Sequence, residues 1–153
     1  MIKEFTTLDI LNVMSWYNDA KDRMSHFPIK LQWYLKQNID AMRAVGEKFS
    51  ELRNELADKL QADWFASDKA EDYTDEESGE AGRKIKSEFE QDYEDAVAKC
   101  NAEIGELLDE KNEINIVPFD VDAYVDSLSD DVIGDEHTLR DLNVIAMIMK
   151  GQK

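Results

Sequence analysis

The stretch that decides the fold is Pro28–Phe65, PIKLQWYLKQNIDAMRAVGEKFSELRNELADKLQADWF. Its large apolar residues recur every three or four positions, at Leu31, Leu35, Ile39, Met42, Val45, Phe49, Leu52, Leu56 and Leu60. This spacing puts them on one face of a helix and leaves the charged residues on the other. Pro28 suits the first turn of a helix, and Gly46 weakens the helix without ending it. We therefore predict one helix on the order of 55 Å long.

A second apolar stripe lies between Arg83 and Lys111. It consists of Ile85, Phe89, Tyr93, Ala96, Val97, Cys100, Ile104, Leu107 and Leu108. Neither helix would be stable alone in water with so much like charge, so the two are expected to pack together as a long antiparallel helical hairpin. Cys100 is the only cysteine, and its place on the stripe favours a small core residue over a nucleophile.

The segment between the two stripes, Ser67–Gly82, has no apolar period. It is rich in carboxylates and contains two glycines and a single aromatic residue. Such a segment cannot bury enough surface to offset its chain entropy, so we predict an acidic, flexible loop over residues 67–82. The length of 153 residues fits a single domain, residues 1–153.

Shorter elements flank the hairpin. Ile2–Phe5 has the pattern of a strand, and Thr7 is a plausible N-cap for a following helix that ends near Met24–Phe27. From Glu113 to Asp122 the apolar period changes to two, which predicts a second strand that pairs with the first. Pro118 shifts this alternation and indicates an edge strand or a bulge.

The last helix is expected to begin at Asp135 or Thr138, either of which can cap it. It is apolar nearly all round, so it must pack in a core or against another subunit. The fold class predicted from all these elements is mainly α (α+β): a helical hairpin with extra N- and C-terminal helices and a small two-stranded β element.

The net charge of −17 arises entirely after residue 60. Residues 1–60 hold nine basic and nine acidic residues, whereas residues 61–153 hold nine basic and twenty-six acidic ones. This potential repels phosphates and membrane surfaces and attracts basic protein surfaces. We therefore expect a protein partner, with no direct binding of nucleic acid and no membrane association. No run approaches the ~20 apolar residues that a membrane span needs.

No pattern indicates a catalytic, cofactor or metal site. The acidic run that starts at Asp72 fails the EF-hand template, because Glu77 stands where that template needs glycine. Gly79 and Gly82 lie among carboxylates that would repel a nucleotide phosphate, and no serine has a Gly-x-Ser-x-Gly context. The protein is expected not to be an enzyme and to need no cofactor and no metal.

Two groups of residues are candidates for partner binding. The aromatic residues Trp33, Tyr34 and Trp64 are either core residues or interface anchors. Because Trp33 and Tyr34 are adjacent, one of them should be exposed or in a contact. The second group is a set of carboxylates that either solubilise the second long helix or imitate the phosphates of nucleic acid: Glu88, Asp92, Asp95, Glu103, Glu106, Asp109 and Glu110.

Four segments carry a resemblance to known proteins: Thr7–Leu11, Pro28-Ile-Lys-Leu followed by Asn38-Ile, Glu113–Phe119, and Asp135–Met149. In their order and pattern they resemble a family of small acidic, mostly helical proteins of unknown function encoded by tailed bacteriophages and prophages. The resemblance implies a phage-encoded accessory protein, located in the host cytoplasm or in the virion. It brings no catalytic residues to carry over.

The leading hypothesis is therefore a non-enzymatic interaction protein that uses the helical hairpin and the acidic surface, and that self-associates or docks through its last helix. The alternative is an inhibitor that mimics nucleic acid and occupies the groove of a host defence nuclease or another DNA-binding protein. The two hypotheses differ in salt response, because a mimic's complex should weaken steeply as salt rises.

Overall fold

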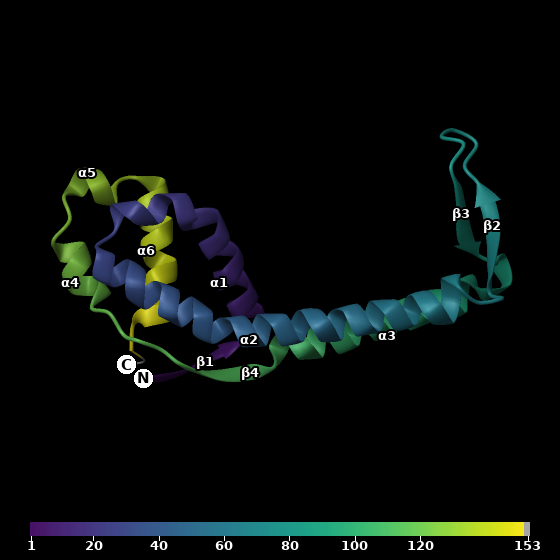
Figure 1. The fold of residues 1–153 in the computed structure, drawn as a ribbon, viewed down its shortest axis with the longest axis horizontal. Helices are drawn as coiled ribbons and strands as arrows, with labels where there is room; N and C mark the ends of the chain where they lie inside the picture. Colours follow the sequence, from purple (N-terminus) through teal and green to yellow (C-terminus); the bar gives the residue numbers. More distant parts are fainter. Residues whose placement is uncertain (152–153) are drawn as a thin grey trace. The chain divides into compact units, whose positions relative to one another are not determined.

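A computed structural model of the chain describes residues 1–151 (Figure 1). Helices account for 69% of the described residues and the strands form small antiparallel pairs, which confirms the predicted mainly α class with a small β element. In chain order the elements are β1 (Ile2–Thr6), α1 (Thr7–Ala20), η1 (Lys21–His26), α2 (Ile29–Leu60), η2 (Gln61–Phe65), β2 (Ala70–Thr74), β3 (Ala81–Ile85), η3 (Ser87–Phe89), α3 (Glu90–Asp109), β4 (Lys111–Asn115), α4 (Val121–Asp126), α5 (Asp130–Ile133) and α6 (Glu136–Met149).

The chain divides into two compact units. Unit 1 comprises Met1–Glu47 and Asp109–Lys153, and unit 2 comprises Lys48–Leu108. Helix α2 contributes residues to both. The single domain expected from the sequence stays a prediction, because a domain in that sense is defined by cooperative unfolding.

Unit 1 is built around one apolar core. Helix α1, the first part of α2 and α6 lie together in this unit (Figure 1), and each turns an apolar stripe inward. The most deeply buried side chains come from all three helices: Ile10, Leu31, Leu35, Met42, Ile145, Ile148 and Met149. The predicted packing of the last helix in a core is therefore confirmed, although Leu139 and Met147 of α6 remain exposed.

The N-terminal strand pairs with the strand after Glu110, as the sequence predicted. Strands β1 and β4 are antiparallel, with Ile2 opposite Asn115. The cap of α1 is Thr6 and not Thr7: the Thr6 hydroxyl accepts a hydrogen bond from the Asp9 amide, and the Asp9 carboxylate accepts one from the Thr6 amide, both at 3.0 Å. This reciprocal capping box satisfies two amides at once.

The predicted strand over residues 113–122 is shorter and begins earlier than expected. Strand β4 ends at Asn115, and at Val117 the backbone forms hydrogen bonds with a side chain and not with a neighbouring strand. Asn38 of α2 donates from its amide to the Val117 carbonyl at 3.0 Å and accepts from the Val117 amide at 2.7 Å, which replaces a strand partner. Asp120 then caps α4 by accepting from the Ala123 amide.

Helix α6 begins after Asp135, one of the two caps considered. The Asp135 carboxylate accepts from the Thr138 amide at 3.0 Å and from the Thr138 hydroxyl at 2.8 Å. Thr138 therefore completes the cap from inside the helix. The segment before it, expected as an acidic loop, contains the short helix α5.

Unit 2 contains the antiparallel helix pair. The part of α2 that begins at Lys48 runs beside α3 in the opposite direction (Figure 1). Near the start of α3, the Tyr93 ring lies edge-on to the rings of Trp64 and Phe65, with centroids 5.6 and 5.5 Å apart. No residue of α3 is fully buried, because only one other helix covers its stripe within this unit.

Residues 67–82, expected as an acidic, flexible loop, contain all of strand β2 and the first two residues of β3. Strands β2 and β3 pair as an antiparallel hairpin, with Ala70 opposite Ile85. For the same reason Arg83 does not start the second helix; it lies in β3, and α3 begins at Glu90 after one 3₁₀ turn. The hairpin is held by hydrogen bonds between the two backbones, and the spacing of apolar side chains does not reveal such bonds.

A glycine-containing turn joins β2 and β3. Gly79 has φ +71°, a conformation that costs other residues energy, and its amide donates to the Asp75 carbonyl at 2.8 Å. The Asp75 side chain accepts from the Glu77 amide at 2.9 Å, which is an Asx turn. Further along, the Tyr73 ring covers Gly82 so closely that a Cβ there would lie 3.0 Å from a ring carbon.

Candidate protein-binding surfaces

The adjacent aromatic residues at the start of α2 separate as predicted. Trp33 is 61% exposed, whereas Tyr34 is half-buried and packs against the core of unit 1. The Lys30 ammonium lies 5.6 Å from the centroid of the Tyr34 ring. The expectation that one of the two residues is exposed is confirmed, and Trp33 is the accessible one.

Trp33 borders a hollow of about 280 Å³ in unit 1, which we call the Trp33 hollow. Its lining is mainly apolar and comes from η1, α1 and the first two turns of α2: Tyr17, Met24, Ile29, Gln32, Trp33, Leu35 and Lys36. Ile29 is 84% exposed, the largest exposed fraction among the large apolar residues that the structure describes. Two large apolar side chains thus lie in solvent beside an apolar depression.

Trp64 is placed differently. It is 8% exposed, its ring packs on Tyr93, and the Lys69 ammonium lies 4.4 Å from its centroid. Within unit 2 it is a core residue and does not offer an accessible anchor. Of the three aromatic candidates, Trp33 alone is an exposed one.

The candidate carboxylates divide between the two units. Glu88, Asp92, Asp95 and Glu106 are exposed in unit 2, and Glu103 is half-buried there. Asp109 and Glu110 are exposed in unit 1, where the Glu110 carbonyl accepts from the Thr7 amide at 2.9 Å. None of the seven forms an ion pair with any residue that the structure describes. Asp95 accepts a hydrogen bond from the Gln91 side chain at 3.1 Å.

Glu103 borders a second, smaller hollow, of about 160 Å³, between the helices of unit 2. Cys100 lines it beside Leu56 and Leu60, and is half-buried. Lys59 and Lys99 on one hand and Asp63 and Glu103 on the other surround it, so the charges around this hollow balance.

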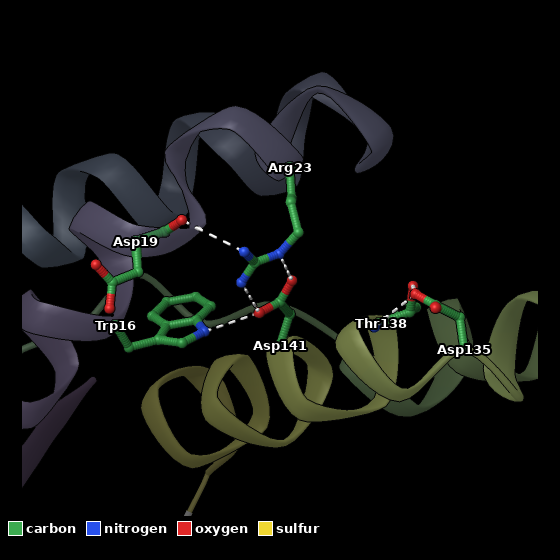
Figure 2. Close-up of polar contacts among 6 residues, drawn as sticks. All are labelled: Trp16, Asp19, Arg23, Asp135, Thr138 and Asp141. Carbon is green, nitrogen blue, oxygen red and sulfur yellow. Dashed lines mark hydrogen bonds and ion pairs between the residues drawn. The ribbon is translucent and has the colours of Figure 1, made fainter.

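A buried polar cluster in unit 1 joins α6 to α1 and η1 (Figure 2). Asp141 is 1% exposed and accepts three hydrogen bonds: from Trp16 Nε1 at 2.9 Å, from Arg23 Nε at 3.0 Å and from Arg23 Nη2 at 2.9 Å. Arg23 also donates to the Asp19 carbonyl at 3.3 Å. The guanidinium therefore holds the carboxylate in a two-pronged pair, and every oxygen of Asp141 has a partner.

The pKa of Asp141 is set by two opposing effects, burial and hydrogen bonding. Burial alone would raise the pKa of the carboxyl, but the hydrogen bonds from Arg23 and Trp16, together with the charge of Arg23, outweigh burial and the pKa lies below its usual value. The same pair raises the pKa of Arg23. Asp141 is sealed from solvent, and its hydrogen bonds link α6 to Trp16 of α1 and Arg23 of η1.

Composition and motifs do not reveal Asp141 and Asn38, the buried polar residues that link elements of unit 1. Each stands at a core position of a helical apolar stripe, Asn38 between Leu35 and Met42, and Asp141 three residues before Val144 and four before Ile145. A polar residue on the buried face is the signal that could have found them, because a buried polar group must have partners.

Among residues 1–151, the structure contains no group of three or more His, Cys, Asp or Glu side chains that could hold a metal ion. Within the same part of the chain, no helix is both long and apolar enough to cross a membrane. No protein-family model, curated protein or solved structure matches the chain. The resemblance to phage-encoded proteins therefore stays a prediction.

Proposed function

We propose that the protein acts without catalysis, by binding a positively charged protein through the acidic surface of unit 2. The observation that carries this proposal is the set of exposed carboxylates on η3 and α3 that have no ion-pair partner among the described residues. Unit 2 as a whole holds eight basic and eighteen acidic residues, a net charge of −10. Such a surface steers a basic partner toward it and rejects acidic ones.

The charge density of α3 bears on the kind of partner. Its twenty residues include seven carboxylates and one lysine, and they extend about 30 Å at 1.5 Å per residue. The average is roughly one carboxylate per 4 Å, close to the spacing of about 3.4 Å per phosphate along one strand of DNA and well below the density of a duplex. The carboxylates fall in two groups, with none between Asp95 and Glu103.

A second candidate function follows from this density. The surface of α3 could imitate a single nucleic-acid strand and occupy the groove of a DNA-binding protein, an inhibitor directed against a defence nuclease being one example. In that case the partner's basic groove, and not merely its net charge, would decide binding.

The test compares two acidic-surface variants at equal charge. The first is Asp92→Asn, Asp95→Asn, Glu106→Gln on α3. The control is Asp22→Asn, Glu47→Gln, Asp126→Asn, which removes three exposed carboxylates from unit 1. The probes are an HU-type DNA-binding protein and hen lysozyme, a basic protein without a nucleic-acid groove, and binding is measured by titration calorimetry at low and high salt.

The proposal expects binding to both probes that weakens with salt, is lost in the α3 variant and is retained in the control. Binding to the HU-type protein alone, with competition by DNA, would favour the nucleic-acid mimic. Equal loss in both variants would mean that only total charge matters, and the proposal would be abandoned; so would absence of binding at low salt.

A further inference from the structure

We propose that the Trp33 hollow of unit 1 is a separate docking site, which binds a short acidic segment of a partner protein by taking in one large apolar side chain. This site does not depend on the acidic surface of unit 2. It differs from that surface in the sign of its charge and in its apolar lining.

The apolar part of the argument rests on Trp33 and Ile29. Exposure of 61% and 84% leaves both side chains largely in water, which is unfavourable for groups of this size. Tryptophan is also the residue type most enriched among side chains that dominate binding energy. Beside them, Met24 and Leu35 floor a hollow of about 280 Å³, which has room for an inserted side chain.

The charge around the hollow is positive, in a chain whose net charge is −17. Lys30 and Lys36 lie three residues before and after Trp33, so all three share one face of α2. The first turn of α2 has no acidic side chain to offset the positive end of the helix. Arg23 is neutralised by Asp141, and Lys36 shares Asp40 with Arg43. The remaining charged residues over 21–43 give a net charge of +2: Lys21, Asp22, Lys30, Lys36, Asp40 and Arg43.

The size of the apolar surface favours a short segment over a second copy of the chain. A large side chain buries on the order of 150–250 Å² when fully covered, so Trp33 and Ile29 together offer roughly 300 Å². A stable protein–protein interface needs about 800 Å² per partner. A peptide anchored by one residue, with carboxylates that reach Lys30 and Lys36, fits this area.

The test uses synthetic helical peptides of about 12 residues, with leucines on one face and glutamates on the other, and a twin in which every glutamate is lysine. The readout is the tryptophan fluorescence of the full chain. Trp16 and Trp64 are each 8% exposed, so acrylamide quenching reports mainly on Trp33. The acidic peptide should protect Trp33 from quenching, more weakly at high salt, and the lysine twin should not.

Two variants and one control complete the experiment. Trp33→Ala, followed by fluorescence anisotropy of a labelled peptide, should weaken binding about 30-fold, the effect of a typical anchor residue. Lys30→Gln with Lys36→Gln should weaken it about tenfold and remove the salt dependence. Leu139→Ala, which truncates an apolar side chain of unit 1 that is 48% exposed and outside the hollow, should leave affinity unchanged.

Three results would overturn the proposal. The first is equal affinity for the acidic peptide and its lysine twin. The second is affinity that survives Trp33→Ala while circular dichroism shows the variant to be folded. The third is a concentration-dependent dimer in sedimentation that disappears in Trp33→Ala, since the occupant would then be a second copy of the chain.

Discussion

Replacing Asp141 by asparagine should destabilise unit 1 by about 3 kcal/mol, the lower end of the cost of breaking a buried ion pair. Asparagine can still accept from Trp16 Nε1 through its oxygen. The same oxygen, in the place of Oδ1, can also still accept from Arg23 Nη2. The amide group, however, would take the place of Oδ2 and face Arg23 Nε, so the hydrogen bond of 3.0 Å is lost, two donors oppose each other, and the negative charge that pairs with Arg23 is removed. We expect a cost at the lower end of this range because the Arg23 side chain is 36% exposed, so its guanidinium can be hydrated once the carboxylate is gone.

The assay is guanidinium unfolding followed by far-UV circular dichroism at about pH 7. Trp16→Phe, which removes one donor and leaves the Arg23–Asp141 pair, should cost about 1 kcal/mol. Arg23→Met should destabilise the native chain more than it destabilises the Asp141→Asn chain. In the native chain it leaves a buried carboxylate without its ion-pair partner, whereas the Asp141→Asn chain has no such carboxylate. A loss below about 0.5 kcal/mol for Asp141→Asn would refute the view that this cluster fixes α6 on the core.

The same pair has a pH signature. The folded-state pKa of Asp141 is lowered, so its contribution to stability is fully present above the unfolded pKa of about 3.9 and is lost as pH falls through the folded value. The difference in unfolding free energy between the native chain and Asp141→Asn should therefore shrink only in acid. A constant difference down to about pH 2 would contradict the ionised pair.

Three further outcomes are expected. Asn38→Ala, which leaves the amide and carbonyl of Val117 without their partners, should cost about 2–3 kcal/mol in the same unfolding assay; a neutral result would show that water replaces the side chain. Thr6→Ala removes the cap of α1 and should cost about 1 kcal/mol, whereas Thr6→Ser should cost less. Gly79→Ala, at φ +71°, should weaken the β2–β3 hairpin by about 1 kcal/mol, visible as loss of cross-strand nuclear Overhauser contacts between Tyr73 and Gly82, and intact contacts would count against the turn.

The helices and the β1–β4 pair could be predicted because their signals are local or nearly so. The stripe from Leu31 to Leu60 has one period over many turns, and the change of period after Lys111 marks the strand that pairs with Ile2–Thr6. The aromatic pair at Trp33 was also resolved correctly, since adjacent helical residues point to different faces.

The hairpin of unit 2 could not be predicted in the same way. Its residues from Glu71 to Glu80 are all exposed, so no apolar alternation marks β2. What stabilises it lies across the strands: Glu71 with Lys84 at 3.6 Å, Asp72 with Arg83 at 3.5 Å, and the Tyr73 ring on Gly82. These are pairings between residues about ten positions apart, which period and composition do not register.

The candidate site was predicted only in part for a related reason. Composition located the acidic surface, and adjacency located Trp33, but the hollow beside it is formed by Met24 and Tyr17 from other elements. Burial of Trp64 likewise depends on Tyr93, which approaches it only once α3 runs back along α2 within unit 2. Such features arise from tertiary packing.

The absence of any fully buried residue in α3 should govern how unit 2 opens. Water already reaches part of the apolar stripe that covers α3. The amide protons of α3 should therefore exchange with deuterium through openings that cost less free energy than the openings that expose the amides of Ile10 or Ile145 in unit 1. Native-state exchange in low denaturant would then show two tiers of protection. A protease that cuts within α3 should do so without waiting for the core of unit 1 to melt.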